Sequence, residues 1–182
     1  MDRRDFLKKA GVGTVALASF PALAEAASAK AYGPGYIFVG ASHAETTPDG
    51  VQHRIIMDGK GQFVGQSEVR GSGSFVHWNN APPGTPKPII ATGRWKATGA
   101  KRANTIGTYG IYAGGFVEML VDLFPQGKPP ISGATLKVVC NLGPAGLHTD
   151  EGEEGFYLTI PGGEMGTFEP FSPPLGVTII SL

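Results

Sequence analysis

Short runs of apolar or alternating residues, separated by glycine and proline, recur along the chain from about residue 36 onward. The runs are rich in β-branched and aromatic side chains, which is typical of strands. They predict ten strand segments, at residues 36–41, 51–57, 62–69, 74–78, 88–97, 105–112, 116–124, 134–142, 156–160 and 176–182. Ten is a high count for a domain of this size, and two of these segments can be halves of one bent strand.

No window after the first thirty residues carries a sustained helical period, and this pattern predicts an all-β domain built from one antiparallel sheet. The sheet either closes as a β-barrel or folds as a β-sandwich. Glycines inside the runs mark bends or bulges and favour the barrel; these are Gly93, Gly107, Gly110, Gly114 and Gly115. Two short polar segments, 58–61 and 101–104, are predicted to be hairpin turns.

Alternation along two of the segments assigns their faces. In 116–124, one side carries Val117, Met119, Val121 and Leu123 and is predicted to be core, which leaves Glu118 and Asp122 facing solvent. In 134–142, Cys140 shares its side with Leu136 and Val138. A thiol on an apolar face is predicted to be buried and unreactive.

The first thirty residues differ from the rest in composition. Two arginines and two lysines precede an uncharged run from Ala10 to Leu23, followed by small residues that suit a signal peptidase. This run is shorter than the roughly 20 residues that a membrane-spanning helix needs. Residues 1–29 are therefore predicted to be a signal peptide and residues 30–182 a single all-β domain without a transmembrane helix.

The segment Arg3-Arg4-Asp5-Phe6-Leu7-Lys8 resembles the twin-arginine export signal, in which two arginines precede any residue, Phe-Leu and usually Lys. Asp2 stands where that signal usually has Ser or Thr. The resemblance implies that the twin-arginine export machinery recognises Arg3 and Arg4 and that the chain leaves the cytoplasm already folded. A periplasmic or extracellular location follows, whether the signal is cleaved or kept as an anchor.

Composition narrows the classes of function. Removing residues 1–29 from the 182 leaves 153, with a net charge of −1. This charge argues against nucleic-acid binding, and the single cysteine excludes a disulfide framework within the chain. A domain of this length can bury a sufficient core without disulfides.

Charge is divided unevenly along the chain. No acidic residue occurs from 69 to 117, and no basic residue occurs from 138 to the end. We predict that a basic patch faces the acidic segment 150–154, within one subunit or across the interface of a homo-oligomer. The alternative is an anion-binding site beside an inward-facing tryptophan. The residues concerned are Arg94, Trp95, Lys96, Lys101 and Arg102.

Two histidines are the candidate catalytic residues. His53 alternates with Val51, Ile55 and Met57, and His77 shares a side with Phe75, so both are predicted to face the interior. Either could be a general base, or a hydrogen-bonded core residue. No Gly-x-Ser-x-Gly motif indicates a nucleophilic hydrolase.

Metal ligand types occur without the spacing of a known site. Cys140, His148 and Met165 would suit a blue-copper centre, but seven residues separate the cysteine from the histidine, and Cys140 lies within a strand. The acidic segment 150–154 offers oxygen ligands without a calcium-loop signature. The sequence therefore predicts no metal and no cofactor.

The rhythm of the strands and the glycine content resemble those of Gly-rich eight-stranded barrels, such as the dirigent and allene oxide cyclase families. This resemblance implies a small barrel enzyme, a cyclase or isomerase acting on a hydrophobic substrate. The leading hypothesis is instead a non-enzymatic binding or structural module of the cell envelope. A titratable group lining a pocket of about 300 Å³ or more would favour the enzyme.

Overall fold

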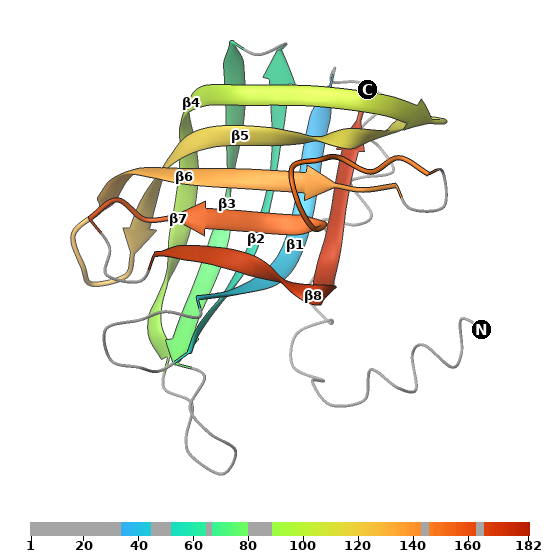
Figure 1. Cartoon of the computed structure of the whole chain (residues 1–182). Coiled ribbons are helices and arrows are strands. Elements are labelled where there is room, and N and C mark those ends of the chain that lie inside the picture. The colour runs from blue at the N-terminus through green and yellow to red at the C-terminus, as the bar shows by residue number, and fades with distance from the viewer. Residues whose placement is uncertain (1–33, 45–51, 65–66, 80–88, 143–145, 163–165) are drawn as a thin grey trace. The chain divides into compact units, whose positions relative to one another are not determined.

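The computed structural model describes residues 34–44, 52–64, 67–79, 89–142, 146–162 and 166–182. The leader with Arg3 and Arg4, and Met165, lie outside these residues. Eight strands are formed (Figure 1): β1 (Gly35–Ala44), β2 (His53–Val64), β3 (Glu68–Asn79), β4 (Ile89–Tyr109), β5 (Tyr112–Pro125), β6 (Ile131–Cys140), β7 (Gly155–Thr159) and β8 (Thr167–Ser181). No described residue lies in a helix, so this part of the chain contains no helical segment fit to cross a membrane.

The strands form one closed antiparallel barrel. Each strand pairs with the next in chain order, and β8 pairs with β1 to complete the ring. Closure removes the free edges that a sandwich leaves. The structure thus confirms the predicted all-β class and the barrel rather than the sandwich.

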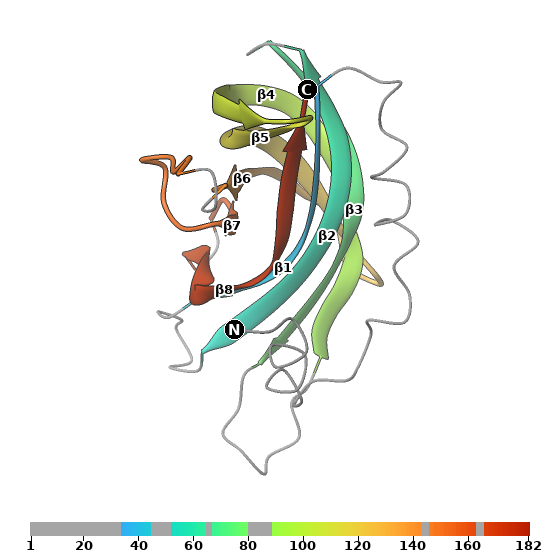
Figure 2. The ribbon, with the colours of Figure 1, turned by 90° about the vertical axis from the view of Figure 1, so that its right-hand side faces the viewer.

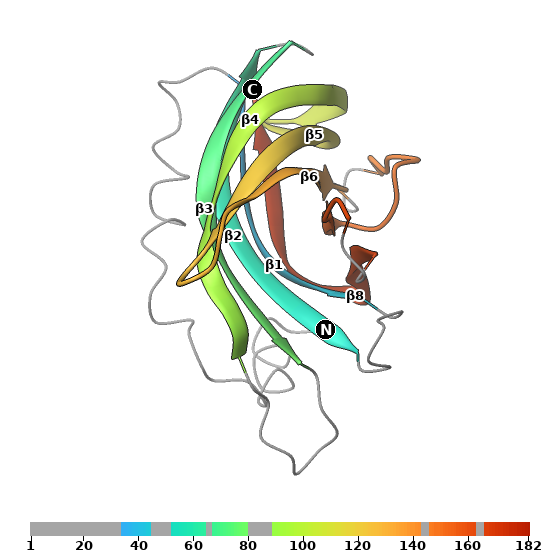
Figure 3. The same ribbon diagram turned by 90° about the vertical axis from the view of Figure 1, so that its left-hand side faces the viewer.

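The long strand β4 bends and so joins two layers of the barrel. In Figure 1, β1, β2 and β3 run across the direction of β5, β6 and β7, and Figures 2 and 3 show the two groups on opposite sides of the barrel. The first part of β4 pairs with β3, and its remainder continues along β5 alone. Register shifts near Gly99 and Gly107 lie in that second part. Bulges of this kind let one strand change layers at a corner.

The bent β4 accounts for one pair of predicted segments. The segments 88–97 and 105–112 share this strand over most of their length, which confirms that two of the ten were halves of one. The predicted hairpin at residues 101–104 is therefore wrong, because these residues continue the ladder with β5. The actual turn follows Tyr109, where Gly110 adopts a φ of 65° that favours glycine.

The predicted hairpin at residues 58–61 is also wrong. These residues lie within β2, which runs on to Val64 before β3 begins at Glu68. The predicted strand 62–69 therefore contains the connection between the two strands. The glycines that suggested a turn have another role, because a Cβ on Gly59 would meet the Trp95 indole and one on Gly61 would meet the ring of Tyr36. They leave room inside the barrel for two large side chains.

The last strand is longer than its sequence pattern predicts. Predicted for 176–182, it begins at Thr167 and contains Pro170, Pro173 and Pro174. Proline weakens a strand prediction because it has no N–H for the ladder. A register shift against β1, between Ala41 and Ser42, accompanies the bend in β8.

The interior of the barrel is filled by side chains from all eight strands. The predicted core faces of β5 and β6 are confirmed, since Val117, Met119, Val121, Leu136 and Val138 are completely buried. The largest fully buried side chains are Trp95, Tyr36, Phe38, Phe156, Phe168, Ile55, Met57, Met119, Leu123, Leu136, Leu158 and Ile180.

Candidate functional site

The two candidate histidines meet inside the barrel. His53 begins β2, His77 lies near the end of β3, and both face inward as predicted, with 2% and 8% of their surface exposed. Nδ1 of His53 lies 2.9 Å from Nε2 of His77, which is hydrogen-bond distance. The ring of Phe168 packs edge-on against His77. The structure thus places in contact two residues that the sequence analysis could only treat separately.

The electrostatics of this pair favour a neutral imidazole at His77. Burial, followed by the charges of His53 and Lys128, lowers the pKa of His77 to about 4. At neutral pH His77 is therefore an uncharged hydrogen-bonding partner of His53. Such a pair can transfer a proton only to a group within hydrogen-bond reach.

Neither of two cavities in the described part of the chain is lined by these histidines. One, of about 10 Å³, lies between β1, β7 and β8 and has room for about one water molecule. The other has a volume of about 710 Å³ and is open to solvent. We call it the outer groove; it is lined by Asp58, Gly71, Ser72, Gly73, Ser74, Arg94, Trp95, Lys96 and Phe124.

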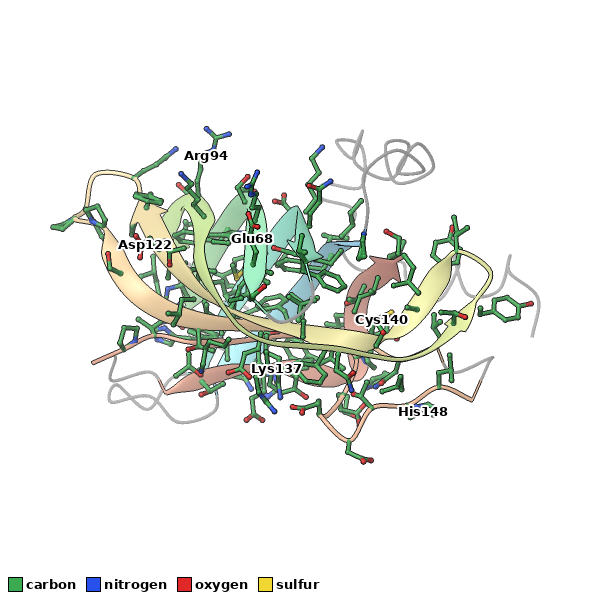
Figure 4. The ribbon with its side chains drawn as sticks, turned by 90° about the horizontal axis from the view of Figure 1, so that it is seen from above. Glu68, Arg94, Asp122, Lys137, Cys140 and His148 are labelled. Carbon is green, nitrogen blue, oxygen red and sulfur yellow. The ribbon has the colours of Figure 1, made fainter. Side chains whose placement is uncertain are left out.

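The outer groove contains three of the five residues predicted to form a binding site. Arg94 and Lys96 are exposed, and Figure 4 shows Arg94 projecting away from the barrel. Trp95, between them on β4, points inward as predicted and is 1% exposed. Its indole N–H donates to the backbone oxygen of Asp58 at 2.8 Å. Trp95 therefore fixes the floor of the groove, and the two cations are its accessible groups.

Hydroxyl and carboxylate groups of β2 and β3 complete the groove. The carboxylate of Asp58 accepts hydrogen bonds from the backbone N–H and the hydroxyl of Ser74, at 2.8 and 2.9 Å. In the strand register, Ser74 stands beside Arg94 and Ser72 beside Lys96. Asp58, Ser72 and Ser74 were not predicted as site residues. The available signal was the alternation of polar and glycine residues in β2 and β3, but at 58–61 this pattern predicted a turn instead.

The other two residues of the predicted basic patch lie farther along β4 and belong to a different cluster. The Nζ of Lys101 lies 2.7 Å from Glu118, and the Nη2 of Arg102 lies 2.9 Å from the same carboxylate. Arg102 also binds Glu151, which lies 3.6 Å from Lys137. We call these five residues the ion-pair network. The predicted contact with segment 150–154 is confirmed for Arg102, within one subunit. Lys101 pairs with Glu118 instead, and Arg94 and Lys96 lie in the outer groove.

Glu118 corrects one expectation about exposure. It faces outward from β5 as predicted, yet only 9% of the residue is exposed because Lys101 and Arg102 cover it. Burial alone would raise the pKa of Glu118, but hydrogen bonds from the two cations lower it overall. The expectation of a solvent-facing carboxylate is therefore wrong for Glu118.

The cysteine and the histidine considered for a metal site have different surroundings. Cys140 is buried as predicted, and its thiol donates to the backbone oxygen of Thr178 at 3.3 Å. His148 is exposed on the segment that follows β6 (Figure 4). Among the described residues, no group of three or more His, Cys, Asp and Glu side chains is placed to hold a metal ion.

Comparison with protein-family models, with curated proteins and with solved structures finds no match to this chain. The histidine pair, the ion-pair network and the outer groove are therefore the features that bear on function.

Proposed function

We propose that the protein is a non-enzymatic binding module of the cell envelope, and that it binds through the outer groove. One observation carries this proposal: the large depression lies on the outside of β2, β3 and β4, whereas the described interior is filled by side chains. Binding sites are typically concave and carry a few polar groups on a rigid scaffold. The groove meets this description because its polar side chains project from three paired strands.

A blocking variant tests this proposal. The side chain of Ser72 is exposed in the groove, so Ser72→Trp would fill it without changing charge. Thr108→Trp, at an exposed position near the far end of β4, is the matched control. Both are compared with the unmodified protein for co-sedimentation with an envelope fraction from the producing cells. We expect Ser72→Trp to lose binding and Thr108→Trp to retain it; equal binding by all three proteins would place the binding surface elsewhere.

We further propose that the protein reaches the periplasm or the outside of the cell by the twin-arginine route. The segment from Arg3 to Lys8 supports this proposal through its match to the export signal. The double variant Arg3→Lys, Arg4→Lys should remain in the cytoplasm, and N-terminal sequencing of the exported protein should begin between Glu25 and Lys30. Undiminished export of the double variant would refute the assignment.

The contact between His53 and His77 favours a second candidate, a small barrel enzyme that acts on a hydrophobic substrate. A buried histidine with a shifted pKa, such as His77, is a common feature of active sites. The filled interior around Phe168 opposes this candidate, since a substrate must reach one of the rings. Titration with small hydrophobic ligands, followed by the NMR resonances of the histidine rings, distinguishes the two. A saturable shift of both rings would favour the enzyme over the binding module.

A further inference from the structure

We propose that the ligand of the outer groove is an extended anionic polymer, an acidic polysaccharide, whose acidic groups contact Arg94 and Lys96 and whose sugar rings contact Phe124. This inference rests on the proposed function and adds the chemical class of the ligand.

The two cations of the groove are available to a ligand. Arg94 and Lys96 are exposed, and no hydrogen bond or ion pair joins either of them to another described residue. Lys101 and Arg102, on the same strand, are by contrast held by Glu118 and Glu151. Since residues i and i+2 of a strand share a face, Arg94 and Lys96 stand about 7 Å apart along β4. Neighbouring acidic groups of one chain can contact both.

The openness of the groove favours a polymer over a small molecule. Sites for small ligands enclose most of the ligand surface, whereas this groove of about 710 Å³ is open to solvent. A small anion would gain few contacts there. A long chain gains contacts over several strands, because the lining residues come from β2, β3, β4 and β5.

The exposed ring and hydroxyls favour a sugar polymer. Phe124 of β5 stands beside Arg94 in the strand register and is 42% exposed, although it is a large apolar side chain. An aromatic face beside a cation can contact the apolar face of a sugar ring while the cation binds its acidic group. The hydroxyls of Ser72 and Ser74 supply hydrogen-bonding groups of the kind that sugar hydroxyls can pair with.

The small number of cations in and beside the groove opposes a nucleic acid. Asp58 lies in the groove, held by Ser74, and Asp122 stands beside Lys96 in the register and accepts a hydrogen bond from the N–H of Gly133. Two carboxylates near two cations cannot match DNA, which carries about one charge per 1.7 Å of its axis. A polysaccharide with sparser acidic groups fits this balance better.

Charge-removal variants of the full chain test the inference. Arg94→Gln, Lys96→Gln removes both cations from the groove, and Arg70→Gln, Lys128→Gln removes the same charge outside it, at exposed positions. Binding is measured against polygalacturonate, against the neutral glucan dextran, and against double-stranded DNA at several salt concentrations. Thermal melting verifies that all variants fold.

We expect the groove variant to lose about tenfold or more in affinity for polygalacturonate and to show a weaker salt dependence, because charge-assisted hydrogen bonds are lost. The control variant should bind nearly as the unmodified protein does. Phe124→Ala should reduce affinity without changing the salt dependence, since the ring carries no charge.

Three outcomes would overturn the inference: equal loss in both double variants, preference for dextran, or preference for DNA. Envelope binding that Ser72→Trp abolishes but that the charge variant retains would leave the proposed function standing and refute the anionic ligand. Failure of Ser72→Trp to affect envelope binding would refute the proposed site itself.

Discussion

The guanidinium of Arg102 donates to both carboxylate oxygens of Glu151 at 3.1 Å, across 49 residues of sequence. The same side chain donates from Nε to Glu118 at 2.9 Å. One exposed arginine thus ties β4 to β5 and to the segment that precedes β7. The network fastens the acidic segment to the barrel wall within one subunit.

Reversing this arginine should destabilise the barrel in a salt-dependent manner. Arg102→Glu places a third carboxylate beside Glu118 and Glu151, and like charges repel most strongly at low ionic strength. We expect a lower melting temperature in low salt, partly restored by adding Glu151→Arg. Asp150→Arg, one residue away, is the control and should restore less. Equal rescue by both second changes would show that net charge, and not this contact, matters.

Removing the carboxylate of Glu118, which Lys101 and Arg102 cover, should lower the stability of the barrel. Glu118→Ala leaves Lys101 and Arg102 without their shared partner, and the loss of a charged hydrogen-bonding partner typically costs about 1–3 kcal/mol. The pKa of Glu118 is lowered in the folded protein. The stabilisation that Glu118 contributes is therefore present above the pKa of the unfolded chain and is lost as pH falls through the lower pKa of the folded protein. Urea unfolding at pH 7 and pH 3 measures both effects. A stability difference between Glu118→Ala and the unmodified protein that persists unchanged at pH 3 would contradict this account.

The glycines that face the barrel interior should not tolerate a side chain. Gly59→Ala directs a methyl group into the Trp95 indole, and overpacking of this kind typically costs about 1–3 kcal/mol. Gly99→Ala is the matched control, because its Cβ would find only Leu120 at 3.8 Å, an ordinary contact. We expect a lower denaturation midpoint for Gly59→Ala and little change for Gly99→Ala. Equal midpoints would mean that the indole does not occupy this space.

His77 should make the free energy of unfolding fall as the pH becomes mildly acidic. The pKa of His77 is about 4 in the folded protein, whereas an unfolded histidine titrates near 6.5. Between these values the unfolded chain binds the additional proton, so stability falls as pH drops from about 6.5 towards 4. His77→Gln keeps a hydrogen-bonding side chain beside His53 and should flatten this part of the profile. Identical slopes between pH 6.5 and 5 in the two proteins would exclude His77 as the cause.

The single thiol should react only after unfolding. Cys140 is 1% exposed, and burial raises its pKa to about 11, so that little thiolate forms at pH 8. A thiol reagent should label the native protein far more slowly than the protein in guanidinium. Labelling at the same rate in both conditions would mean that the thiol is accessible in the native state.

The sequence pattern predicted the class of fold because alternation assigns strand faces without knowledge of tertiary contacts. Val117 and Cys140 were placed correctly on this basis. The sequence pattern failed at Gly59 and Gly61. A glycine-rich segment can be a turn, or it can be part of a strand against which a large ring from another strand packs, and local sequence does not distinguish the two. Only the position of Trp95 and Tyr36, set by other strands, decides between these alternatives.

The candidate site was predictable residue by residue but not in its grouping. Inward-facing histidines could be identified from alternation, whereas their contact depends on the register between β2 and β3. The basic residues were identified from composition, yet the bend of β4 separates Arg94 from Arg102 and gives them different neighbours. Phe124 could not be recognised as a residue of the groove, because its place beside Arg94 depends on the register between β4 and β5.

The pairing of Gly35 with Ser181 has a consequence for the timing of folding. During synthesis, β1 is the first strand to leave the ribosome, and the strand that closes the barrel against it is the last. The ring cannot close before β8 has emerged, and this large sequence separation predicts slow formation. Under the proposed twin-arginine route, this slow closure must therefore be completed in the cytoplasm before the barrel meets the translocase.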